Sequence, residues 1–387
     1  MMNIQLLNKI AAVGTDKLDR AAYNVGADVT APDAIMVRSA AMHDMEFADN
    51  LLAIARCGAG VNNIPIDRCS EQGIVVFNTP GANANGVKEL AVAALLLASR
   101  DIVGGIAWAN SLAGTEGVAK AVEAGKSKFG GNELAGKTLG VIGLGAIGGM
   151  VANTAAGLGM NVIGCDPYLT VDAAWSLSRS IKHALVETDI YSQADYITLH
   201  VPATPSTKKM INAETIAMMK DGAKLINLSR ADLVDADAVK AALASGKLSC
   251  YVTDFPTEET VNVPGIITIP HLGASTAESE DNCAVMAAVQ LDDYLRNGNI
   301  RNSVNFPNVS MPRTPGTRIC VMHDNIPAIL SKISGVMGDL HINIDNMINK
   351  SKGDNAYTML DVSSEVPADA VEKLHAIEGV GRIRVIG

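Results

Sequence analysis

The sequence predicts an α/β protein that contains two doubly wound parallel-sheet domains and a small C-terminal βαββαβ domain. Three observations carry this prediction. The chain has 387 residues, which is enough for two or three domains with separate cores. Short apolar runs alternate with helix-length stretches over residues 1–304. A proline-rich segment, residues 305–317, then precedes a second pattern of strands and helices.

The first domain is expected to be a complete α/β unit. The segment Gly86–Arg100 is apolar nearly all round, which is typical of a helix buried between two domains. Ser275 to Glu278 have the pattern of a capping box and predict a second long helix that ends at Asn297-Gly298. Buried parallel strands are expected before these helices, at Ile4–Leu7, Ala34–Val37, Leu51–Ala55 and Ile74–Phe77.

The second domain opens on a glycine fingerprint. The apolar strand Thr138–Ile142 runs into Gly143-x-Gly145-x-x-Gly148, in the order that a dinucleotide-binding turn requires. Gly143 permits the tight turn, Gly145 lets the backbone approach a pyrophosphate, and Gly148 allows close packing of helix on strand. The unpaired N–H groups at the helix start, which include those of Ala146 and Ile147, then bind the pyrophosphate.

Asp166 predicts which dinucleotide binds. It ends the strand Val162–Cys165, 23 residues beyond Gly143, and a carboxylate there accepts hydrogen bonds from both ribose hydroxyls. The same carboxylate repels a 2′-phosphate, and Pro167-Tyr168 supply no arginine to receive one. The sequence therefore predicts NAD rather than NADP. The alternative is a glycine-rich turn in an ordinary α/β domain. Further strands of this domain are expected at Tyr196–Val201, Lys224–Leu228 and Ile266–Ile269.

The two long helices flank this cofactor domain, so we expect the chain to leave its first domain and later return to it. This division predicts a discontinuous substrate-binding domain of residues 1–87 and 274–304, and a continuous NAD-binding domain of residues 88–273. Residues 305–317 are then a linker, and residues 318–387 form the C-terminal domain. Its expected elements are the strand Arg318–Met322, a helix around 329–337, strands Ile342–Ile344 and Tyr357–Val362, the helix Pro367–Ile377 and the strand Arg382–Ile386.

Composition excludes several classes of protein. A net charge of −10 argues against a nucleic-acid surface. The 6 cysteines show no C-x-x-C spacing, so neither a disulfide framework nor a metal site is expected, and a reducing cytoplasm is the simpler location. The start lacks the layout of a signal peptide, and the apolar segment Leu90–Ala98 is too short to span a bilayer. We therefore expect no membrane association.

Three residues after the fingerprint suit hydride transfer to a 2-keto acid. Arg230 ends a strand and can hold a substrate carboxylate while polarising the carbonyl. His271 ends another strand and can exchange a proton with the alkoxide, and Glu258 can favour the imidazolium and raise the pKa of His271. Each also has a structural alternative: Arg230 can pair with Asp232 or Asp235, Glu258 can be an ordinary turn acid, and His271 can be a core histidine.

With these residues in place, the sequence resembles the D-2-hydroxyacid dehydrogenase family over almost its full length. The motifs that carry the resemblance are Gly143–Gly148 with Asp166, His200-Val-Pro202, Ile226–Arg230, Asp254–Glu258 and Pro270–Thr276, together with Val37–Ser39 and Arg56–Asn63. The resemblance implies the roles of Arg230, Glu258 and His271 argued above. It also assigns Pro202, Asp254 and Gly273 to the cofactor, and Arg38, Ser39, Arg56 and Gly58, with Arg230 and His271, to the substrate.

Two departures from the family pattern occur near the catalytic residues. Ala231 stands where the family usually carries Gly, and Glu259 stands where Pro commonly follows the acid, which makes Glu259 a rival for the acid position. Neither change removes a functional group.

The substrate expected from the resemblance is a phosphorylated hydroxyacid, 3-phosphoglycerate, oxidised with NAD in an amino-acid biosynthetic pathway. Its carboxylate and phosphate need more cations than lactate would, and Arg38 and Arg56 match substrate positions. Lys126 and Lys128 can add charge from a loop, although surface salt bridges are the favoured interpretation for both. The alternatives are a glyoxylate or hydroxypyruvate reductase, and an NAD(H)-sensing regulatory protein with vestigial catalysis.

Residues 318–387 resemble an ACT domain, the regulatory module of many amino-acid biosynthetic enzymes. Serine-inhibited relatives carry His-x-Asn-x-Pro-Gly in the ligand loop; here the loop is His323-Asp-Asn325-Ile-Pro327-Ala328, and Asn343 matches a further ligand position. The resemblance implies L-serine as an effector that binds across a dimer, while Ala328 in place of Gly crowds the loop. With the apolar helix at Gly86–Arg100, it also implies a homodimer or homotetramer.

Overall fold

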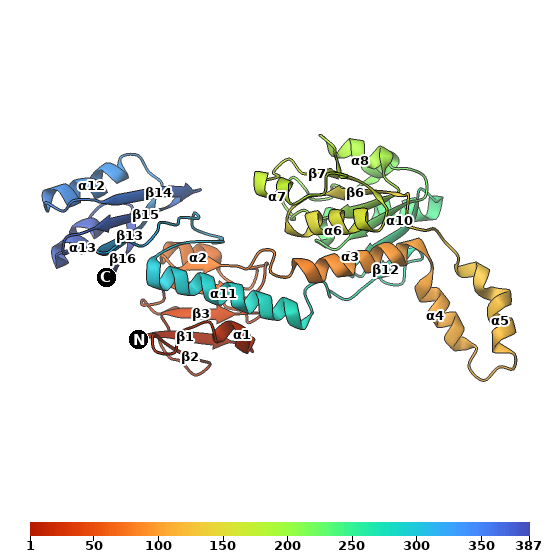
Figure 1. The fold of residues 1–387 in the computed structure, drawn as a ribbon, viewed down its shortest axis with the longest axis horizontal. Coiled ribbons are helices and arrows are strands. Elements are labelled where there is room, and N and C mark those ends of the chain that lie inside the picture. The colour runs from red at the N-terminus through yellow and green to blue at the C-terminus, as the bar shows by residue number, and fades with distance from the viewer. The chain divides into compact units, whose positions relative to one another are not determined.

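The computed structural model describes residues 1–387 and divides the chain into two compact units (Figure 1). Unit 1 joins Met1–Asn83 to Ala277–Gly387, and unit 2 is Ala84–Thr276. Each unit has its own parallel sheet, which confirms the predicted fold class.

Unit 1 begins with a five-stranded parallel sheet in the order β2-β1-β3-β4-β5. The four predicted strands are confirmed within one or two residues; β2 was missed because its Asn and Gly interrupt any apolar run. The strands are β1 Met2–Leu7, β2 Tyr23–Gly26, β3 Ala34–Val37, β4 Ala53–Arg56 and β5 Val75–Phe77, and the short helices are α1 Ala12–Thr15 and α2 Ile66–Glu71.

The long helix α11 (Ala277–Asn297) packs on this sheet, as the capping pattern predicts for its start. Ala287, Ala288 and Leu291 on its buried side share one core with residues of β1, β3 and β4. The helix ends at Gly298, whose φ of +72° is the left-handed conformation that glycine adopts without strain.

Unit 2 contains a seven-stranded parallel sheet in the order β12-β11-β10-β9-β6-β7-β8. From β6 the chain adds β7 and β8 on one side of the sheet and then β9 to β12 on the other. A topological switch point therefore lies between β6 and β9, where such sheets bind their ligands. Its strands are β6 Thr138–Ile142, β7 Asn161–Cys165, β8 Lys182–His183, β9 Tyr196–Leu199, β10 Ala223–Asn227, β11 Leu248–Thr253 and β12 Ile266–Thr268.

The helices of unit 2 cover both faces of this sheet. The segment expected as one apolar helix is α3 (Ala84–Ser99), whose Val87, Ala91 and Leu95 lie in the core. The remaining helices are α4 Ile102–Ser111, α5 Val118–Gly125, η1 Lys126–Phe129, α6 Ala146–Gly157, α7 Val171–Trp175, α8 Glu187–Gln193, α9 Ala213–Ala217, η2 Ala231–Leu233 and α10 Ala236–Ser245.

Helix α4 differs from the other apolar helices because none of its residues is buried. No single helix of the chain is both long enough and apolar enough to cross a bilayer; only α3 and α4 taken together, with a 68° bend between them, reach that length and composition.

The C-terminal domain is a βαββαβ fold with an antiparallel sheet in the order β14-β15-β13-β16, as predicted. The predicted strand Ile342–Ile344 is wrong, because these residues precede a polar, exposed edge strand that shows no apolar pattern. The elements are β13 Thr317–Asp324, α12 Ile329–Asp339, β14 Asn346–Lys352, β15 Asn355–Val362, α13 Ala368–His375 and β16 Val380–Ile386.

Both faces of this C-terminal sheet are covered within unit 1. Ile319, Val321 and Leu360 pack with α12 and α13 on one face, and Met322 and Tyr357 join the core that contains α11 on the other. The pair Arg318 and Asp361 lies fully inside, where the Arg318 guanidinium also donates to three backbone carbonyls.

Of the predicted linker 305–317, residues 305–316 form no helix or strand and Thr317 begins β13. The segment is packed against the domain it follows. The side chain of Asn305 accepts a hydrogen bond from the Val76 N–H at 2.9 Å, and Phe306 is 2% exposed.

Candidate active site

The glycine loop has the shape that a pyrophosphate requires. Gly143 follows β6 with a φ of +88°, and a Cβ placed there would lie 2.5 Å from the carbonyl oxygen of His200. A Cβ at Gly148 would overlap the Gly143 carbonyl, whereas a Cβ at Gly145 would meet nothing within 4 Å. Gly143 and Gly148 are therefore required by the protein's own backbone, and Gly145 leaves open space at the start of α6, beside the N–H groups of Ala146 and Ile147.

Asp166 is anchored beside this loop. Its Oδ2 accepts from the Leu144 N–H at 2.8 Å and its Oδ1 accepts from the Tyr168 N–H at 2.9 Å. Each carboxylate oxygen has two acceptor sites, so both retain capacity for a ribose hydroxyl. The site fits a dinucleotide.

Arg230 lies just after β10, and a buried amide holds its backbone. The Nδ2 of Asn227 donates to the Arg230 carbonyl at 2.8 Å, and the Arg230 Nη1 donates to the Ser229 carbonyl at 2.6 Å. Arg230 forms no ion pair, so the alternative in which Asp232 or Asp235 is its partner is not borne out.

Phe255 connects Arg230 with His271, and the sequence did not single it out. The Arg230 guanidinium lies 5.7 Å from the centroid of the Phe255 ring, and the His271 ring lies 4.6 Å from it. The structure thus gathers the predicted Arg and His around one aromatic side chain.

Asp254 is the buried carboxylate of this group. It is 1% exposed, and its Oδ1 has no hydrogen-bond partner. Burial raises the pKa of Asp254, and the neighbouring His271, the Gly273 N–H and Arg230 offset this only in part. An unpartnered buried acceptor fits a cofactor amide that donates to it. Pro202, which the sequence also assigns to the cofactor, lies after β9, where its carbonyl accepts from the Thr207 hydroxyl at 2.7 Å.

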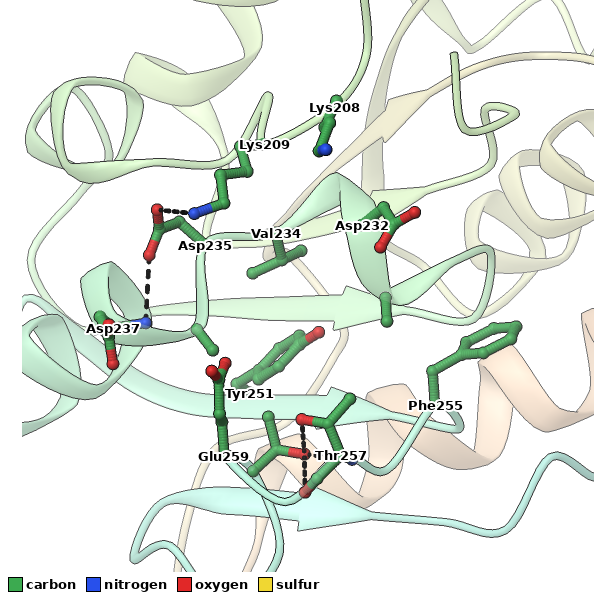
Figure 2. Close-up of a pocket in the computed structure, with 13 residues that line it drawn as sticks. Lys208, Lys209, Asp232, Val234, Asp235, Asp237, Tyr251, Phe255, Thr257 and Glu259 are labelled. Carbon is green, nitrogen blue, oxygen red and sulfur yellow. Dashed lines mark hydrogen bonds and ion pairs between the residues drawn. The ribbon is translucent and has the colours of Figure 1, made fainter. Parts of the chain in front are cut away.

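Glu258 is exposed, and no hydrogen bond or ion pair joins it to His271 in this structure. Its expected effect on the pKa of His271 therefore stays a prediction. Glu259, the rival acid, lines a separate pocket of about 260 Å³ (Figure 2).

One ion pair lies within this pocket. The Lys209 ammonium donates to Asp235 at 3.0 Å, Asp235 also accepts from the Asp237 N–H at 3.1 Å, and Glu259 faces them (Figure 2). Phe255 stands at its edge, so the pocket adjoins the Arg230 group without containing Glu258 or His271.

The predicted substrate residues come together in unit 1 at the carboxyl ends of β3 and β4. Val37 pairs with Arg56 across the two strands, and the Arg56 Nε donates to the Arg38 carbonyl at 3.1 Å. The Arg56 guanidinium also covers Gly58, where any Cβ would overlap it. The structure therefore places two arginines at the ends of neighbouring strands, Arg56 as the last residue of β4 and Arg38 directly after β3.

Two further residues hold this group, and the sequence did not single them out. The Oδ1 of Asn8 accepts from the Ser39 and Ala40 N–H groups at 3.0 and 2.8 Å. Glu280, on α11, accepts from the Arg38 Nη2 at 2.6 Å. Of the two lysines in doubt, Lys126 pairs with Glu123 at 2.5 Å on the surface, which confirms the salt-bridge interpretation.

The candidate effector residues of the C-terminal domain have separate internal partners. The His323 Nδ1 bonds the Asp324 carbonyl and its Nε2 bonds the Thr358 hydroxyl, both at 2.8 Å. Asn325 donates to the Gly353 carbonyl at 3.1 Å, and Asn343 donates to Asp345 at 2.8 Å. None of these bonds joins one of the three residues to another.

Comparisons with known proteins agree with the cofactor loop and the two parallel-sheet domains. Residues 94–273 match the family model described as "D-isomer specific 2-hydroxyacid dehydrogenase, NAD binding domain". The chain is 34% identical over 354 residues to the D-3-phosphoglycerate dehydrogenase of Haemophilus influenzae, covering 88% of this chain and 83% of that protein. The Escherichia coli K12 enzyme of the same name is 33% identical, with 88% and 82% covered.

Solved structures show the same fold. The NAD⁺-bound 3-phosphoglycerate dehydrogenase of Entamoeba histolytica superposes with a TM-score of 0.61 at 25% identity, over 79% of this chain and 98% of that one. The apo D-mandelate dehydrogenase of Rhodotorula graminis reaches a TM-score of 0.67 at 21% identity, over 81% and 99%, and shows the fold alone.

Proposed function

The chain belongs to the D-isomer-specific 2-hydroxyacid dehydrogenase family, and from this premise we propose that it oxidises 3-phospho-D-glycerate to 3-phosphohydroxypyruvate with NAD. Residues 94–273 form its NAD-binding domain. The observation that carries the proposal is the grouping of Arg230, His271 and Asp254 around Phe255 in the same unit as the cofactor loop.

In the proposed reaction, each protein group has one task. NAD, when bound, accepts the hydride that leaves C2 of the substrate. The Arg230 guanidinium holds the substrate carboxylate and the C2 oxygen, because a planar cation with several donors suits both. His271 takes the proton of the C2 hydroxyl. The unpartnered Oδ1 of Asp254 would accept a hydrogen bond from the cofactor amide. Glu258 supports the imidazolium that forms on His271.

Arg38 and Arg56, with Ser39 and Gly58, are the proposed binding residues for the anionic groups of the substrate. Their support is the pair of guanidinium groups at the ends of β3 and β4. Because the carboxylate is assigned to Arg230, only a phosphorylated hydroxyacid brings a second anionic group for these cations.

A steady-state assay tests the assignment. We expect kcat/KM for oxidation of 3-phosphoglycerate to exceed that for glycerate. In the reverse direction, we expect kcat/KM for 3-phosphohydroxypyruvate to exceed that for hydroxypyruvate and for glyoxylate. A preference for the unphosphorylated acids would instead make the protein a reductase of those acids. His271→Asn should abolish turnover while NADH still binds. Arg38→Ala should weaken the binding of the phosphorylated substrate more than that of the unphosphorylated acids. A wild-type chain that binds NADH without turnover would be an NAD(H) sensor.

The C-terminal domain is proposed to act as an ACT module that takes L-serine. The support is the βαββαβ topology together with His323, Asn325 and Asn343. Because both His323 nitrogens are engaged, serine has to replace the bond to Thr358 or to the Asp324 carbonyl. Calorimetry with L-serine tests this, and the absence of both binding and inhibition at millimolar serine would reject it.

We also propose a cytoplasmic homodimer or homotetramer. Ile102, Val103 and Ile106 of α4 are between 39% and 58% exposed, and a second copy would cover them. Ile106→Glu should then shift the mass measured by light scattering toward the monomer, and an unchanged mass would exclude α4 from the interface.

A further inference from the structure

The guanidinium of Arg38 is already occupied by a carboxylate of its own chain. Its Nη2 lies 2.6 Å from the Oε1 of Glu280, and both side chains are 43% exposed. Arg38 follows β3 in the sequence, and Glu280 belongs to the first turn of α11, 242 positions away.

The two elements hold this pair in place. Val37, directly before Arg38, is fully buried, and Ser279 and Cys283 flank Glu280 on the buried side of α11. The Oδ1 of Asn8 fixes the loop after Arg38 through the Ser39 and Ala40 N–H groups. These contacts fix the backbone on both sides, at the end of β3 and in the first turn of α11, so that the Arg38 and Glu280 side chains can meet.

We propose that Glu280 sets the affinity of this protein for its anionic substrate by competing for the Arg38 guanidinium. This inference rests on the proposed role of Arg38 in substrate binding. A substrate phosphate or carboxylate that binds Arg38 has to displace the Glu280 carboxylate or share the guanidinium with it. In both cases the negative charge of Glu280 opposes an incoming anion.

The expected size of the effect follows from the exposure of the pair. Half-exposed ion pairs are weak and are screened by salt, so removing the competitor should tighten anion binding by about two- to five-fold at low ionic strength. Glu280 has no place in proton or hydride transfer, so kcat should not change.

The chain offers a matched control in the same helical turn. Glu278 is exposed, carries the same charge near the N-terminus of α11, and has no ion pair with Arg38. Glu280→Gln and Glu278→Gln remove equal charge from the same turn, and only Glu280→Gln releases the guanidinium.

The test measures the Kd of 3-phosphoglycerate and of inorganic phosphate by calorimetry on the full NADH-saturated chain, with KM and kcat for 3-phosphoglycerate. We expect Glu280→Gln to lower Kd and KM two- to five-fold at constant kcat, with the gain lost at high salt and Glu278→Gln close to wild type. In an Arg38→Ala background, Glu280→Gln should have no effect.

Three outcomes would overturn the proposal: unchanged or weaker binding in Glu280→Gln, an equal gain in both variants, or a gain that persists without Arg38. An equal gain in both variants would mean that negative charge anywhere in this helical turn weakens anion binding, without a specific competition for Arg38. Failure of the proposed function appears separately, as a wild-type chain that binds phosphate through Arg38 but does not oxidise 3-phosphoglycerate.

Discussion

The side-chain amide of Asn227 spans the turn that presents Arg230. Its Nδ2 donates to the Arg230 carbonyl at 2.8 Å, and its Oδ1 accepts from the Ser229 N–H at 3.1 Å. Asn227 is fully buried at the end of β10, and the Tyr251 hydroxyl lies 3.3 Å from its Nδ2. A single buried amide therefore holds the backbone of the turn at which β10 ends and Arg230 follows.

Asn227→Asp should keep the acceptor and lose the donor, and so place a carboxylate against the Arg230 carbonyl. We expect kcat/KM to fall by about 10- to 100-fold, the cost of an unsatisfied buried polar group, while the Kd of NADH stays within about two-fold. Steady-state kinetics and NADH fluorescence measure the two effects. Asn153→Asp is the control, since Asn153 bonds the Ser176 carbonyl and the Ser178 N–H in an equivalent way at the surface. A loss in kcat/KM as large in the control would contradict a local role for Asn227.

Ala328→Gly should stabilise the protein. Ala328 precedes α12 with a φ of +65°, a left-handed conformation that costs an L-residue about 1–2 kcal/mol and glycine nothing comparable. After the entropy that glycine loses on folding, a net gain of about 1 kcal/mol and a higher Tm remain. Ala376→Gly, at a φ of −71° after α13, should lower Tm instead. Scanning calorimetry compares the two, and a drop in Tm for both would show that Ala328 is not strained.

His200 should make the folded state sensitive to acid. Burial lowers the pKa of His200 to about 4, and its Nδ1 has no partner. The unfolded chain takes up the proton near pH 6.5 while the folded chain resists it, so this contribution to stability is intact above pH 6.5 and is lost as the pH falls toward 4.

His200→Gln should therefore flatten the fall in unfolding free energy between pH 6.5 and pH 4, by up to about 1.4 kcal/mol per pH unit. Urea denaturation at several pH values measures the slope. His183→Gln, at an exposed position on β8, should leave it unchanged. Equal slopes for wild type and His200→Gln would show that His200 is not responsible.

Asp361→Asn should destabilise unit 1 strongly. Burial raises the pKa of Asp361, but hydrogen bonds from Arg318 and Thr314 outweigh that effect and leave the pKa lowered. Removing this carboxylate strands a buried guanidinium, which costs about 3–5 kcal/mol. Asp369→Asn breaks an exposed pair with Lys373 in the same domain and should change little. Thermal unfolding of both variants tests the contrast, and equal shifts would refute it.

The dinucleotide site could be predicted because its parts are close in sequence. Gly143, Gly145, Gly148 and Asp166 all belong to one strand–helix–strand unit, whose periodicity and glycine spacing are local signals. The edge strand β14 was misplaced since an exposed polar strand leaves no apolar pattern, and α4 was not predicted at all.

The residues that position the site escaped prediction for a different reason. Glu280 reaches Arg38 across 242 positions and Asn8 reaches Ser39 across 31, and no spacing rule connects such partners. Phe255 and Asn227 lie inside recognised motifs, but their roles depend on which neighbour each side chain meets. Glu258 shows the converse, because its motif is clear while its contact with His271 stays a prediction.

The core that the C-terminal sheet shares with α11 affects which truncations and domain exchanges this protein tolerates. The Tyr357 hydroxyl donates to the Gly298 carbonyl at 2.7 Å, and Arg384 lies 4.5 Å from the Tyr294 ring while donating to the carbonyls of Tyr294 and Leu295. A truncation after Phe306 would expose one side of this core to solvent. It would also remove Tyr357 and Arg384, which contact the end of α11. We therefore expect the βαββαβ segment to unfold together with the rest of unit 1, and its exchange by gene fusion to destabilise that unit.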